Sequence, residues 1–169
     1  MKFIPRLIAL TAVVCLGIAS HMRAADLSIT ASAVVPSANA QINEATAGAT
    51  ITAGQLIYLD TTDLDNRSRP KAKLADANSS TAAVRSVAGI SINGASAGQR
   101  VSYVYQDPAL VIAASGLTAN TILVLSATAG GIAPAADVTT GWFLSVVAVV
   151  KSGTTIYFSA PGLPSGASS

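Results

Sequence analysis

The sequence predicts an all-β fold, namely a single small β-sandwich or barrel with an extended N-terminal arm. Short apolar runs separated by Gly, Asn, Asp and Pro recur along most of the chain, a pattern typical of antiparallel sheets. Hydrophobic residues make up 51% of the chain but aromatic residues only 5%, so small and β-branched residues dominate its apolar content. Such residues suit strands, and helical periodicity is weak.

The first segment of the chain, residues 1–24, differs from the rest. Two basic residues precede an apolar run over 7–19, and small residues precede Ser20, which is the layout of a secretory signal peptide. The segment also fits an upstream extension that precedes a true start near Met22, or a tag left by cloning. Because the apolar run is shorter than the roughly 20 residues of a stable membrane span, no such span is expected.

Residues 25–160 are expected to form the β-rich domain, and residues 161–169, rich in Pro, Gly and Ser, a flexible tail. The N-terminal arm is expected around 25–35. In the first half of the domain, apolar runs bounded by turn residues predict strands over 27–35, 55–59, 87–92 and 99–105. The last run alternates well, which places its Val and Tyr side chains on one face of a sheet.

The second half of the domain continues the same pattern. Pro108 is expected to interrupt the sheet, because proline cannot donate a ladder hydrogen bond. Further strands are then predicted over 109–113, 121–126, 142–150 and 155–159. Residues 75–85 are expected to form a loop or a single turn, because Ser and Thr are poor formers of a helix interior.

A faint internal repeat relates Ile51–Asp60 to Leu117–Ser126. In each copy a turn that ends in Gly or Asn precedes a short apolar strand. Two interpretations stay open: a duplicated unit, or the general resemblance of one hairpin to another.

The inventory of reactive side chains excludes several function classes. The chain contains one cysteine, Cys15, and one histidine, His21, and both precede the β-rich domain. The domain therefore has no disulfide, no Cys/His metal site and no Ser/His/Asp arrangement. Its carboxylates are few and lie in loops, and no phosphate-binding glycine motif is present. We expect no catalytic residue, no cofactor and no metal site, and hence not an enzyme.

The loop with Asp60, Asp63 and Asp65 is the strongest candidate for a cation site. Carboxylates suit Ca²⁺, but the loop lacks the glycine and the closing glutamate of a Ca²⁺ loop, and basic residues follow directly. We therefore favour a solvated hairpin loop with local ion pairs.

A basic stretch, Arg67, Arg69, Lys71 and Lys73, follows that loop. Its alternation predicts one charged face of an edge strand, which discourages stray pairing and could meet an acidic partner. Three of the ten basic residues precede residue 25, which leaves seven against eight acidic residues. This near-neutral balance, and the absence of interleaved aromatic residues, argue against nucleic acid as a partner.

Four stretches of the domain, in this order, resemble the head decoration, or cement, proteins of tailed bacteriophages. They are "GQLIYLD" within Gly54–Asp60, "KLADANSSTAA" at Lys73–Ala83, "GISINGASAGQRV" at Gly89–Val101 and "LTANTILVLSATAGGIAP" at Leu117–Pro134. Each stretch is a generic hairpin, so their order and joint presence carry the resemblance.

The resemblance implies a non-enzymatic β-sandwich or small barrel that binds the outer surface of a phage head and bridges major capsid subunits. It also implies assembly in the host cytoplasm, a location on the virion, and self-association as a dimer or trimer. The alternative is an exported β-sandwich, a surface or adhesin-like module that self-associates. That module would be secreted or periplasmic if the leader is a true signal peptide.

Three sets of residues are the predicted contacts with a protein partner. The first is the basic stretch, and the second is Trp142, since tryptophan is a frequent interface anchor. The third is the N-terminal arm, because an extended segment can add a strand to a neighbouring sheet. The arm residues singled out are Leu27, Ile29 and Val34.

Overall fold

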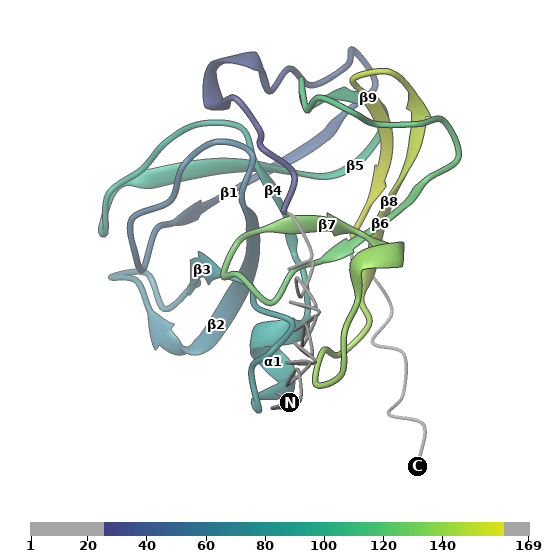
Figure 1. Ribbon diagram of the computed structural model, residues 1–169. Coiled ribbons are helices and arrows are strands. Elements are labelled where there is room, and N and C mark those ends of the chain that lie inside the picture. The colour runs from purple at the N-terminus through teal and green to yellow at the C-terminus, as the bar shows by residue number, and fades with distance from the viewer. Residues whose placement is uncertain (1–25, 161–169) are drawn as a thin grey trace, which may run out of the picture.

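The computed structural model describes residues 26–160, so the predictions for residues 1–24 and for the tail lie outside the described residues. The described chain is nearly all β and curls into a half-barrel, which confirms the predicted fold class (Figure 1). The strands are β1 (Gln41–Thr46), β2 (Leu56–Leu64), β3 (Pro70–Leu74), β4 (Gly89–Ser91), β5 (Arg100–Val111), β6 (Ile122–Leu125), β7 (Ile132–Pro134), β8 (Val146–Ser152) and β9 (Thr155–Ser159). The helical elements are η1 (Ala31–Ala33), α1 (Ala82–Arg85) and η2 (Ala135–Asp137).

All strands belong to one antiparallel sheet with the order β3-β2-β4-β5-β9-β8-β6-β7, and β1 pairs with β5 outside this path. The long strand β5 connects the two halves, because its first part pairs with β1 and β4 and its last part with β9. A bridge between Ala47 and Ala72 brings the chain after β1 against β3. The half that contains β1 to β4 therefore curls back on itself, beside the half with β6 to β9 (Figure 1).

The two halves repeat one strand arrangement. The order β3-β2-β4-β5 in the first half equals β7-β6-β8-β9 in the second. Gly54 and Asn120, which the sequence repeat aligns, both have positive φ, 89° and 67°. The backbone N–H of Gly54 donates to the Ser91 carbonyl, and that of Asn120 to the Val150 carbonyl, each at 2.8 Å. The sequence repeat therefore corresponds to a structural repeat.

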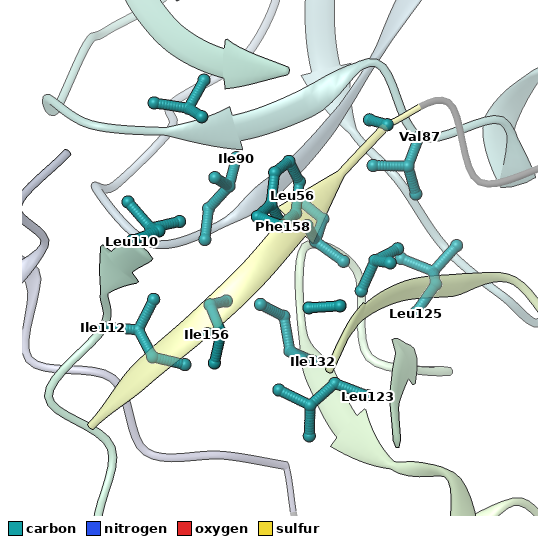
Figure 2. Packing of buried hydrophobic residues seen from close by; sticks show 14 of the residues in the cluster. Leu56, Val87, Ile90, Leu110, Ile112, Leu123, Leu125, Ile132, Ile156 and Phe158 are labelled. Atoms are coloured by element: carbon teal, nitrogen blue, oxygen red, sulfur yellow. The ribbon is translucent and has the colours of Figure 1, made fainter. Parts of the chain in front are cut away.

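The larger hydrophobic cluster lies where the two halves meet. Figure 2 shows side chains from β2, β4, β5, β6 and β9 converging there, with Phe158 among them. Phe158 is 2% exposed, and its strand pairs with both β5 and β8. A second, smaller cluster fills the curled half and includes Ile57 and Val101. Phe158 thus belongs to the contact that joins the halves.

Several predicted strand boundaries are wrong, and three of them have a clear physical cause. No strand spans 27–35. The backbone N–H of Leu27 donates to the Ile132 carbonyl of β7, and the 3₁₀ turn η1 interrupts the segment. Within this segment, Val35 alone forms a bridge to β5. Pro108 does not end β5, because the pairing with β9 skips the proline through a register shift between Asp107 and Leu110. The strand expected over 142–150 begins at Val146. The backbone N–H groups of Trp142 and Phe143 donate instead to the carbonyls of Thr139 and Ala77, outside the sheet. The single turn expected in 75–85 is confirmed as α1.

The buried carboxylate of Asp107 fixes the N-terminal segment to the sheet. It accepts hydrogen bonds from the backbone N–H of Ser37 (2.8 Å), the Ser37 hydroxyl (2.5 Å) and the backbone N–H of Ala109 (2.8 Å). Asp107 is 1% exposed, so its removal leaves donors without a partner in a site that excludes water.

We expect Asp107→Ala to lower the free energy of unfolding by about 2–3 kcal/mol, as judged from the cost of unpaired buried groups and lost charge-assisted bonds. Urea unfolding followed by circular dichroism measures the loss. Ser37→Ala is the matched control, because it removes the hydroxyl donor alone and is expected to cost about 1 kcal/mol. Equal losses in the two variants would contradict a central role for the carboxylate.

Candidate protein-binding site

An exposed aromatic loop precedes β8. Gly141 has φ of 97°, which favours glycine, and it turns the chain so that the backbone N–H of Trp142 donates to the Thr139 carbonyl at 3.3 Å. The backbone N–H of Phe143 donates to the Ala77 carbonyl at 3.0 Å and ties the loop to the segment before α1. Trp142 is half-buried, while Phe143 is 39% exposed. The loop therefore presents aromatic side chains from an anchored backbone.

Arg85, at the end of α1, stacks on this loop. Its guanidinium carbon lies 3.6 Å from the centre of the Phe143 ring, a cation–π contact. One guanidinium nitrogen also donates to the Ser79 carbonyl at 2.9 Å. Both ends of the contact are therefore held before any partner arrives. We name Arg85, Trp142, Phe143 and Leu144 the Arg85 patch.

The outer face of β6, β8 and β9 carries a second exposed apolar group. Ile122 pairs with Val149, and Val149 with Tyr157, so their side chains form one row across three strands. The row continues into a groove of about 750 Å³, whose walls include Tyr105, Pro108, Val149 and Tyr157.

The predicted local ion pairs of the acidic loop are confirmed. Lys73 Nζ lies 2.9 Å from Asp60 Oδ2 and 2.8 Å from Asp63 Oδ2, on neighbouring strands of one hairpin. Two further pairs belong to the hairpin: Lys71 with Asp63 (2.7 Å) and Arg69 with Asp65 (2.9 Å). β3 lies at the end of the strand order, but the backbone N–H of Gly48 donates to the Ala72 carbonyl at 2.8 Å, so its outer side is partly paired. Three of the four predicted basic contacts are thus paired within the chain.

Hydrogen bonds within the hairpin hold the pKa of its carboxyls down. The Thr62 hydroxyl, and then the Lys73 ammonium, lower the pKa of Asp60 well below its ordinary value. The backbone N–H of Arg69 is the main cause of the low pKa of Asp65, and the partial burial of that carboxyl opposes it. Ionised carboxylates are therefore the form that the folded hairpin stabilises.

Acid is expected to destabilise the fold through this hairpin. A carboxyl whose pKa is lower in the folded chain than its ordinary 3.8 contributes stability above about pH 4, and that contribution is lost as the pH falls toward the folded pKa. The melting temperature of the wild type should thus fall more steeply between pH 4 and pH 2 than that of Asp60→Asn/Asp63→Asn. Parallel curves for the two proteins would contradict the prediction, and 1 M NaCl should reduce the difference.

The structure places the predicted contact residues in three different parts of the fold. Val34 is 8% exposed and belongs to the main core cluster, and Leu27 and Ile29 pack against the same cluster. The basic stretch lies on the β2–β3 hairpin, where Arg67 is the member without an ion pair among residues 26–160. Trp142 lies in the Arg85 patch. Their binding roles stay predictions, and Arg85, Phe143 and the outer row were not among the predicted contact residues.

Two features are absent from residues 26–160. No group of three His, Cys, Asp or Glu side chains in that part of the chain is arranged to hold a metal ion. The same part has no helix with the length and apolar character needed to cross a membrane. Comparison with models of known protein families and with curated proteins found no match.

Proposed function

We propose that the chain is a structural, non-enzymatic protein that decorates the outer surface of a phage head and bridges major capsid subunits. The observation that carries the proposal is the Arg85–Phe143 stack, an arginine and an aromatic ring held together in an exposed loop beside Trp142. The resemblance of four sequence stretches to head decoration proteins supplies the kind of partner.

The composition of the Arg85 patch favours a protein partner. Tryptophan and arginine are enriched among the residues that dominate binding energy at interfaces. The hydrogen bond from Arg85 to Ser79 and the stacking on Phe143 restrict both side chains in the free protein. Less side-chain freedom is then lost on binding, which favours affinity.

The charges of the domain favour contacts that are mainly apolar. Most of the hairpin's basic side chains already have carboxylate partners, so little free charge is left there to attract an acidic surface. Binding to a shell should therefore depend weakly on salt. A shell offers many equivalent sites, so weak single contacts add up when a decorating protein touches two subunits.

Co-sedimentation tests the proposal. Purified protein is mixed with expanded phage heads from the same source and centrifuged at 0.1 M and at 1 M NaCl. We expect saturable binding to heads at both salt concentrations, and protein in the supernatant when heads are omitted. Protein that stays in the supernatant with heads, and is recovered free in the culture medium with its leader cleaved near Ser20, would favour the exported module instead.

A further inference from the structure

The structural repeat gives each half an apolar row at the same place. In the first half, Leu56 on β2 pairs with Ile90 on β4, which pairs with Val104 on β5. Each of these three side chains is 0% exposed and belongs to the main core cluster. This row is therefore buried where the first half packs against the second, and Figure 2 shows Leu56 and Ile90 there.

The second half carries the equivalent row on its outer face. Ile122 on β6, Val149 on β8 and Tyr157 on β9 follow the same pairing, with exposed fractions of 47%, 36% and 49%. The neighbouring Val146 on β8 is 43% exposed. The row that is an internal interface in one half is thus open to solvent in the other, with β-branched and aromatic side chains in both.

Charge indicates what kind of surface can cover the open row. Strands β6, β8 and β9 contain one charged residue, Lys151, and its ammonium lies 4.9 Å from the centre of the Tyr157 ring. A covering surface with unpaired charges would have to give up their hydration without compensation. An uncharged row of the same kind makes no such demand, and a second copy of the chain supplies one.

We infer that the row Ile122–Val149–Tyr157 is a homotypic interface, which packs face to face against the same row of a second copy about a two-fold axis. Val149 is the middle of the row, so it lies nearest that axis. The row of the first half is covered by side chains of the same chain, and the equivalent row of the second half would be covered by a second copy. It rests on the row and not on the Arg85 patch, so it does not depend on the proposed function.

The size of the row sets the expected strength. Four exposed side chains make an apolar patch of roughly a few hundred Å², less than the ~800 Å² that each partner buries in a standard interface. The dimer should therefore be weak in dilute solution and stronger where copies are held close together.

Sedimentation velocity of the full-length chain over a range of concentrations tests the inference. Ile122→Asp should weaken self-association at least tenfold, because each new carboxylate would be buried without a partner against an apolar row. Ile42→Asp on β1 is the matched control, since Ile42 is 49% exposed and lies outside the row. It should associate like the wild type. Equal association of both variants, or a wild type that stays monomeric at millimolar concentration, would overturn the inference.

Cross-linking tests the position of the axis. In a Cys15→Ser background, Val149→Cys should form disulfide-linked dimers on mild oxidation, whereas Ile42→Cys in the same background should stay monomeric. Dimers that form through Ile42→Cys but not through Val149→Cys would place the contact elsewhere and contradict the inference. Because these experiments contain no shell, their failure leaves the proposed function standing, and failed head binding leaves this interface standing.

Discussion

Replacing Phe143 and Arg85 together by alanine is expected to weaken binding to the shell by about 100-fold. Central aromatic and arginine anchors each contribute about 2 kcal/mol or more to interfaces, and 1.4 kcal/mol corresponds to a factor of ten. The two side chains form one preorganised contact, so we expect less than the sum of two independent losses. Titration of heads with labelled protein in the co-sedimentation assay measures the effect.

Two variants sharpen this test. Ile42→Ala removes an exposed apolar side chain of β1 that lies outside the Arg85 patch, and it is expected to bind like the wild type. A variant with Arg67, Arg69, Lys71 and Lys73 changed to serine tests the basic edge. Because three of these residues have carboxylate partners in their own chain, we expect the smaller loss there. A larger loss in the serine variant than in Phe143→Ala/Arg85→Ala would move the contact to the basic edge.

The strand pattern of the fold could be predicted from sequence because it depends on local alternation. The strand predicted over 155–159 has the same bounds in the structure. The strands β2, β4, β5 and β6 each overlap a predicted strand but differ from it in their bounds. The predicted strand over 27–35 failed for a tertiary reason: its apolar side chains cover the core edge instead of joining a ladder. β5 continues past Pro108 through a register shift after Asp107, which no local pattern reveals.

The candidate sites were harder to predict, because they depend on contacts between distant segments. Trp142 was predicted from the sequence as an interface anchor, but the partner of its neighbour Phe143 is Arg85, which belongs to α1 in a distant segment. The outer row is hidden in the sequence because Val149 lies in a continuous apolar run that reads as core, although it faces solvent between buried Ala148 and Val150. The equivalence of the two halves reveals the row, and the sequence repeat supplies it only for β2 and β6, whereas the strand order adds β4 with β8 and β5 with β9.

Phe158→Ala is expected to lower the free energy of unfolding by about 3–5 kcal/mol, the usual cost of a buried phenylalanine truncation with the cavity it leaves. Total stabilities are about 5–15 kcal/mol, so the loss should be visible as a large shift of the urea midpoint. We expect a free-energy loss in the upper part of this range because Phe158 is 2% exposed and lies on the strand between β5 and β8. Its backbone partners are Asp107 on β5 and Ala148 on β8.

The matched control is Phe143→Ala, which removes the same side chain from an exposed loop and is expected to cost about 1 kcal/mol through the lost cation–π contact. Phe158→Leu should fall between the two, because most of the cavity stays filled. Equal losses at the two phenylalanines would mean that Phe158 does not join the halves. A loss at Phe158 with an unchanged dependence on urea concentration would mean that both halves still unfold together. That cooperativity follows from a core to which both copies of the repeat contribute side chains.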